Sequence, residues 1–251
     1  MSKLIIITAM LITWIGHAQN SEHREVSTFS KISVSDGIEV IYTDGAVVPI
    51  IVQGAEGQSL EDISTTVKNH TLTISRSKSG FPATVLVTAP ALKKIWVSDN
   101  SKFRVKNKMS AAKVSLSLSS GAYFQGSISA DKLWLFASSG TEINLRGSVF
   151  LLKANFINGA RANISGEASH VQIYTEDGAL CDARNLLTNN MRINANGHST
   201  VLINGTGTSS LTASGEAIIK NNRKKAGSAS TIPYRGKALA AKQPVSSNPE
   251  K

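Results

Sequence analysis

The chain of 251 residues contains a single cysteine, Cys181, so no disulfide can form within it. The fold must therefore rely on packing and backbone hydrogen bonding. Beyond the first residues, no stretch approaches the ~20 apolar residues that a membrane-spanning helix needs. Of the five histidines, His70, His170 and His198 lie far apart in sequence, and none of the three has a metal-ligand spacing with another histidine or with the cysteine. We therefore expect no metal and no other cofactor.

The N-terminus has the pattern of an export signal. Lys3 precedes the apolar run LIIITAMLITWIG of 13 residues, which is too short to span a bilayer. Gly16 and Ala18 then provide the small residues that signal peptidase prefers, which predicts a signal peptide over residues 1–18. A retained membrane anchor is the alternative. Cleavage would leave residues 19–251 without a transmembrane segment, in the periplasm, on the outer surface or secreted.

The positive charge is concentrated at one end of the chain. The sequence has 27 basic and 17 acidic residues, and residues 220–251 hold eight of the basic residues but only one acid. The body of the chain is thus nearly neutral. This distribution argues against a nucleic-acid-binding domain, which presents a basic face with a recognisable reading element.

A two-residue pattern recurs from about residue 99 to residue 220. Six pairs of a small polar residue and glycine form a series in which the successive glycines are 19, 19, 19, 19 and 18 residues apart. Asp99-Asn100 opens the series, with asparagine in place of glycine, because both residues tolerate positive φ. A fixed period of this length indicates a repeat architecture. The six pairs are Ser120-Gly121, Ser139-Gly140, Asn158-Gly159, Asp177-Gly178, Asn196-Gly197 and Ser214-Gly215.

The residues between these turns alternate between polar and apolar, as strands do. Inward positions fall three and five residues after each glycine, as at Ile143 and Leu145, and a second apolar pair follows later in each unit. We therefore expect two short strand segments per unit, with a further corner at Gly147, Gly166 and Asn185. Equivalent residues should stack between units, with Asn144, Asn163 and Asp182 outside and Ile143, Ala162 and Cys181 inside. Cys181 is then a buried small residue rather than a nucleophile.

Coils that stack one on another explain this pattern best. A propeller blade needs four strands and about 40 residues, so a unit of 19 residues is too short for one. We predict a single all-β domain over residues 19–251, built as a parallel β-helix with coils of about 19 residues. Residues 29–97 would form the first coils and a strand-rich cap, with a short helical turn within GAEGQSLEDISTTV. Residues 98–220 would form the regular coils, and 221–251 a basic end segment.

The residues FSKISVSDGIEVIYTDGAVVPIIVQGAEGQSLEDISTTVKNHTLTIS, followed by the Ser-Gly and Asn-Gly turns, resemble the head GIN domain family, which is described as "putative auto-transporter adhesin". The family occurs mostly in Bacteroidetes-type bacteria. IPYRGKA, residues 232–238, resembles the usual end of the family, with Ala238 where proline is usual. The resemblance implies a right-handed parallel β-helix outside the cytoplasm. It transfers no catalytic residue.

Two classes of function are compatible with such a chain. One is a non-catalytic binding or structural module of the cell envelope, such as an adhesin. The alternative is a carbohydrate-active enzyme, a polysaccharide lyase or hydrolase, which needs clustered carboxylates. Glu142, Glu167 and Asp182 fall on different columns of the expected stack, and we therefore favour the first class and name no catalytic residue.

The stretch SKFRVKNK contains the best candidate for a binding site. Lys102, Arg104, Lys106 and Lys108 alternate with Phe103 and Val105, so the four basic side chains share one face of a strand. Like charges in a row repel one another unless an anion meets them. The partners would be an anionic glycan, a lipid head group or an envelope protein. The alternative is a solvated edge that charge protects from aggregation. The oligomeric state stays open.

Overall fold

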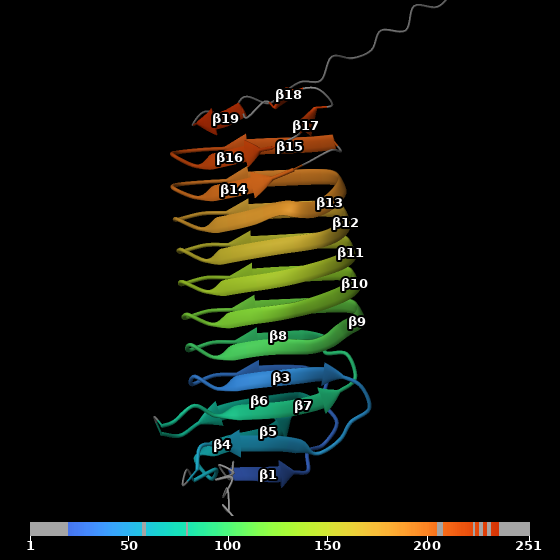
Figure 1. Cartoon of the computed structure of the whole chain (residues 1–251), viewed down its shortest axis with the longest axis vertical. Coiled ribbons are helices and arrows are strands. Elements are labelled where there is room, and N and C mark those ends of the chain that lie inside the picture. Colours follow the sequence, from blue (N-terminus) through green and yellow to red (C-terminus); the bar gives the residue numbers. More distant parts are fainter. Residues whose placement is uncertain are drawn as a thin grey trace, which may run out of the picture.

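The computed structural model describes residues 20–56, 59–78, 80–204, 208–222, 224–225, 228–229 and 232–235. These residues form strands and turns without a helix, and the strands stack into one elongated column (Figure 1). The predicted β-solenoid with coils of about 19 residues is confirmed. Its regular part consists of β9 (Lys102–Leu118), β10 (Tyr123–Ala137), β11 (Glu142–Phe156), β12 (Arg161–Thr175), β13 (Leu180–Ala195), β14 (Thr200–Ile203), β15 (Thr208–Ala213) and β16 (Ile218–Asn221).

Most coils close through the repeated two-residue turn, whereas at Asn196-Gly197 and Ser214-Gly215 only the glycine has positive φ. Asn158 and Gly159 have φ of 52° and 73°, and the N–H of Ala160 donates to the carbonyl of Ile157 over 3.2 Å. Positive φ at both central residues is the requirement of a type I′ turn, which asparagine and glycine meet at low cost. Asp99-Asn100 also has positive φ at both residues, which confirms that Asn100 takes the glycine's role. The turns lie along one edge of the column (Figure 1).

The turns are also bonded to one another from coil to coil. The N–H of Gly140 donates to the carbonyl of Asn158 over 3.1 Å, and the N–H of Gly159 donates to the carbonyl of Asp177 over 2.9 Å. The parallel strand ladders therefore continue through the corner, so that the backbone groups of the turn are paired as well.

In β9 to β13 one continuous strand runs from turn to turn, rather than the two short segments that we expected, whereas β14 and β15 are two separate segments of one coil. In β11 the buried positions pass from Val149 to Leu152, and Phe150 and Leu151 between them face outward. This change of phase bends the strand around the edge opposite the turns. The residues after each turn form what we call the outgoing wall, and those before the next turn form the returning wall.

The interior is built from columns of equivalent residues. One column contains eight buried side chains in eight successive strands, and the predicted stack of Ile143, Ala162 and Cys181 lies within it. Its large members lie toward the N-terminal end, where the Phe103 and Phe124 rings stack 6.1 Å apart. The eight are Val40, Phe103, Phe124, Ile143, Ala162, Cys181, Val201 and Ile219.

The N-terminal coils do not stack in sequence order. β2 pairs in parallel with both β6 and β8, and β3 pairs with both β7 and β9, so the coil of residues 31–44 lies between two coils that come later in the chain. Figure 1 shows β3 between β7 and β9. The strands are β1 (Asn20–Arg24), β2 (Lys31–Val34), β3 (Glu39–Asp44), β4 (Ile50–Gly54), β5 (Ile63–Lys68), β6 (Thr71–Arg76), β7 (Thr84–Ala89) and β8 (Lys94–Val97).

Antiparallel strands cover the first coil. β4 pairs with β7, β1 with β4, and β5 with β6, all antiparallel, so the parallel stack ends in ordinary hairpin-type pairing. Capping of this kind protects the unpaired groups of an end coil. The helical turn expected within residues 54–67 was wrong, because the described residues there form turns and β5, which its hairpin pairing with β6 holds extended.

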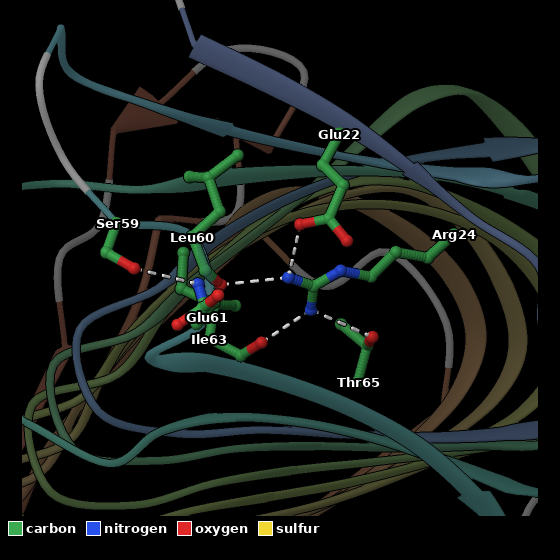
Figure 2. A network of polar contacts seen from close by, with 7 residues as sticks. All are labelled: Glu22, Arg24, Ser59, Leu60, Glu61, Ile63 and Thr65. Atoms are coloured by element: carbon green, nitrogen blue, oxygen red, sulfur yellow. Dashed lines mark hydrogen bonds and ion pairs between the residues drawn. The ribbon is translucent and has the colours of Figure 1, made fainter.

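Arg24 joins the two outermost strands of this cap (Figure 2). Its guanidinium donates to the carbonyls of Leu60 over 2.8 Å and Ile63 over 2.5 Å, and to the hydroxyl of Thr65 over 3.2 Å. Glu22 accepts a further bond over 2.7 Å. One largely buried side chain thus links β1 to the segment that leads into β5, and it satisfies carbonyls that have no strand beyond them.

The C-terminal end is covered in a similar way. β19 (Ile232–Arg235) pairs antiparallel with β16, and β17 (Lys224–Lys225) pairs with β18 (Ser228–Ala229). The predicted signal peptide and most of the basic end segment lie outside the described residues.

The further corner that we predicted in each coil, at Gly147, Gly166 and Asn185, differs from the expectation. Gly166 pairs with Gly147, as predicted, but a bulge in β13 places Leu186 opposite Gly166, and Asn185 falls opposite Ser165. Of the three predicted corner residues, only Gly166 adopts a backbone conformation with positive φ, at 101°. The chain therefore bends at this corner within continuous strands.

The surroundings of Gly166 and Gly147 differ, and this difference should be measurable as a difference in stability. A Cβ on Gly166 would lie 2.0 Å from the carbonyl oxygen of Gly147, whereas a Cβ on Gly147 would have its nearest neighbour at 3.9 Å. We predict that Gly166→Ala lowers the free energy of unfolding by at least about 2 kcal/mol, and that Gly147→Ala has a much smaller effect. Thermal unfolding followed by circular dichroism measures both, and equal losses would contradict the strand pairing described above.

The sole cysteine provides a second test. The Cys181 side chain is fully buried, and burial raises the pKa of its thiol well above the ordinary value. Because the thiolate is the reactive form, we predict that a thiol reagent labels the native protein at pH 8 far more slowly than the denatured protein. Rapid labelling of the folded protein would place Cys181 outside the core.

The cap can be tested at Arg24. Arg24→Met retains the aliphatic stem but removes the guanidinium bonds to the Ile63 and Leu60 carbonyls, of which Leu60 still accepts from the N–H of Ile63, and we expect a loss of about 2 kcal/mol in the free energy of unfolding. The matched control is Glu22→Gln, which removes only an exposed partner and should leave the melting temperature near that of the parent. If Arg24→Met melted like Glu22→Gln, the cap would not depend on this network.

Candidate functional site

A bulge interrupts the pairing of β9 with β10 on the outgoing wall. Residues 105–107 of β9 stand opposite the single residue Gly126 of β10, and regular pairing resumes at Lys108. A Cβ on Gly126 would lie 2.6 Å from the Cβ of Val105, so glycine is what allows Val105 to lie so close. The bulge leaves Lys106 and Lys108 exposed, and Val105, expected to point inward, is only half-buried.

The side chain of Asn107 fixes the shape of the bulge, because its amide group exchanges two hydrogen bonds with the backbone of Asp44, as a neighbouring strand would. The Nδ2 of Asn107 donates to the carbonyl of Asp44 over 2.9 Å, and the Asp44 N–H donates to the Oδ1 of Asn107 over 2.8 Å. The Asp44 carboxylate accepts from the N–H of Ser110 over 3.0 Å. These bonds tie the C-terminal end of the bulge to β3, so the lysines beside it project from an ordered segment.

Arg104 is already paired within the protein. Its Nε lies 2.6 Å from the Oε1 of Glu39, its Nη1 donates to Gln125, and its guanidinium lies 5.0 Å from the ring centre of Tyr123. The hydrogen bond that Arg104 donates to Glu39 raises the pKa of Arg104 above its ordinary value. Arg104 therefore positions neighbouring side chains and contributes less free charge than its type suggests.

Beside the bulge lies a shallow hollow of about 790 Å³ that crosses β9 to β12, which we call the basic groove. Its lining contains four basic side chains and several amides and serines, and it contains no aspartate or glutamate. The polar side chains that line it are Arg104, Lys106, Asn107, Lys108, Gln125, Ser127, Asn144, Arg146, Ser148, Asn163 and Ser165.

The predicted row of basic residues is divided by the fold. Arg104, Lys106 and Lys108 line the basic groove, but Lys102 lies near the turns and lines a separate hollow with Asp36 and Asp99. The groove gains Arg146 instead, which sequence reasoning missed. The signal for Arg146 was present in the repeat, because Lys108, Ser127 and Arg146 follow one another at intervals of 19 residues and pair in successive strands.

An outward column of amides crosses the groove beside these cations. Gln125 pairs with Asn144, Asn144 with Asn163, and Asn163 with Asp182, which confirms the predicted outer stack. Asp182, the only acid of the four, is bonded to Arg184 over 2.6 Å, which lowers the pKa of its carboxyl group. The column thus presents neutral hydrogen-bonding groups where it lines the groove.

Three acids near the groove are occupied by partners in the protein. Glu39 pairs with Arg104, Asp44 accepts from the backbone of Ser110, and Glu142 accepts from Asn144 over 2.8 Å. The exposed charge within the groove is accordingly positive. A phosphate or carboxylate group could bond to Lys106, Lys108 and Arg146 while the amides bond to neutral groups beside it.

A second hollow, of about 940 Å³, lies on the rounded edge of the solenoid. Asp131 of β10 and Glu167 of β12 both line it, although their strand positions belong to different columns. Within the described part of the chain, no three His, Cys, Asp or Glu side chains gather closely enough to hold a metal ion. Nor do the described residues form any helix that is long and apolar enough to cross a membrane.

The stacked coils, the capped ends and a polar, open groove define an elongated β-solenoid of the kind found in bacterial adhesin-like proteins. Residues 28–222 match the family described as "Putative auto-transporter adhesin, head GIN domain". The chain belongs to this family. No curated protein matches it.

Solved structures share the fold at low sequence identity. A putative adhesin from Parabacteroides merdae superimposes with a TM-score of 0.70 at 13% identity, covering 80% of this chain and 95% of its own. A putative lipid binding protein from Parabacteroides distasonis gives 0.64 at 11%, covering 81% and 92%. A putative adhesin from Bacteroides fragilis gives 0.58 at 17%, covering 81% and 96%. At such identities the likeness shows the fold alone.

Proposed function

We propose that this protein is a non-catalytic binding module that works outside the cytoplasm, and that its basic groove holds phosphate or carboxylate groups of a glycan or lipid head group. The observation that carries the proposal is the convergence of Lys106, Lys108 and Arg146 on a groove without acids. Membership of an adhesin-type family supports a binding role. The similar structure of a putative lipid binding protein makes a phosphate-bearing head group a reasonable source of the anion.

The extracytoplasmic location rests on the export pattern over residues 1–18 and on the family. The non-catalytic role rests on the composition of the groove, which offers cations and amides but no general acid or base. Such a site attracts and orients an anion without providing proton transfer.

The test removes the three cations that are not held by an acid. We predict that Lys106→Gln/Lys108→Gln/Arg146→Gln binds polygalacturonate, or vesicles that contain phosphatidylglycerol, at least about tenfold more weakly than the parent at ~0.1 M salt. Binding of the parent should also weaken steeply as salt rises, because the groove is open to screening. Arg104 is left in place, since its loss would disturb Glu39 and Tyr123.

The matched control removes three exposed charges elsewhere, in Lys68→Gln/Arg161→Gln/Lys220→Gln, and should bind like the parent. Comparison of the two probes identifies the source of the anion. The groove proposal fails if both triple variants bind equally well or if the parent binds neither probe. The non-catalytic role fails if the protein shortens polygalacturonate and Asp131→Asn/Glu167→Gln abolishes that activity.

A further inference from the structure

The returning wall carries half-exposed aromatic side chains, on the other side of the coils from the basic groove. Trp96, Trp134 and Phe136 are 39%, 38% and 38% exposed. Ser117 pairs with both Trp96 and Phe136, so a serine separates these two rings along the solenoid axis. Ser115 likewise separates Trp134 from Lys94.

Cations accompany these rings. The Nζ of Lys113 lies 3.7 Å from the centre of the Trp134 ring, and the Nζ of Lys94 lies 5.8 Å from that of Trp96. In the column that continues from Trp134, the next side chains are Lys153, Gln172 and Arg192, all exposed. The wall therefore combines flat aromatic surface with a line of positive charge.

A shallow hollow of about 430 Å³ continues from the aromatic cluster along the axis. It is lined by Trp134, Lys153, Asn155, Gln172, Tyr174 and Arg192, among others, and no aspartate or glutamate lines it. Glu176 lies close by and accepts from the Tyr174 hydroxyl over 2.7 Å. Aromatic faces, amides and cations thus follow one another along the same line, in columns that run across the strands.

We propose that this returning wall binds an acidic polysaccharide laid along the solenoid axis. The C–H groups of a sugar ring carry partial positive charge and can lie on the electron-rich faces of Trp96, Trp134 and Phe136. Sugar hydroxyls can bond to the serines and amides, and acid groups can pair with Lys153 and Arg192. A polymer of repeating units suits a wall whose side chains repeat at one strand spacing, ~4.8 Å.

The composition of the wall favours a polysaccharide over a bilayer. A membrane-binding face needs a continuous apolar surface that can be buried among acyl chains. Here serines separate the aromatic side chains, and a lysine lies over the Trp134 ring. A surface that alternates between apolar and hydrogen-bonding groups matches a sugar, which is itself apolar on its faces and polar at its edges.

The experiment uses the full chain that already carries Lys106→Gln/Lys108→Gln/Arg146→Gln, so that the basic groove cannot contribute. In this background we expect residual binding to polygalacturonate, and Trp96→Ala/Trp134→Ala/Phe136→Ala should weaken it at least about tenfold. Two of the three tryptophans of the sequence lie on the wall, so the ligand should also shift intrinsic fluorescence before, but not after, these substitutions.

The control substitutes equally apolar, exposed residues away from the wall, as Val48→Ala/Phe150→Ala/Leu187→Ala, and should bind within about twofold of the background protein. The inference is overturned if the aromatic variant binds polygalacturonate as well as this control does, or if the background protein binds none. It is also overturned if the wall binds phosphatidylglycerol vesicles in preference to polygalacturonate. Because the groove is disabled throughout, none of these outcomes contradicts the groove proposal.

Discussion

A hydrogen bond from the second residue of one turn to the first residue of the next, repeated from the turn at Gly37 to the turn at Gly159, sets the geometry of the molecule. It requires a corner that is two residues long and adopts positive φ in successive coils, as at Gly140, Gly159 and their equivalents. Once those corners are aligned, the strands between them must have nearly equal lengths. Equal lengths keep inward residues in columns, and the columns give both a continuous core and two walls with regular surfaces.

Much of this arrangement could be predicted from the sequence, because it is periodic. The 19-residue interval and the alternation after each glycine predicted the solenoid, the inner column through Cys181 and the outer column through Asn163. The order of the first coils escaped prediction because it breaks the period. The early coil of residues 31–44 is placed between later ones by pairing between distant strands, and no local signal records that choice.

The candidate site was predictable in part for the same reason. Alternate spacing identified Arg104, Lys106 and Lys108 but implied a uniform row with Lys102. The bulge over residues 105–107 depends on a space at Gly126 and on Asp44, a residue distant in sequence, and alternation alone cannot reveal it. Arg146 lies in the next coil but one from Lys108, so it becomes visible only when the coils are aligned with each other.

The division of the chain into interior coils and separate caps bears on how such proteins vary in length. Arg24 and the antiparallel strands close the N-terminal end, while a central coil touches mainly its two neighbours. Insertion of one more block of 19 residues between Gly140 and Gly159 would leave both caps unchanged. It would extend each wall by one strand spacing, ~4.8 Å. Gene duplication in whole repeats can thus adjust the span of surface offered to a partner without a new fold.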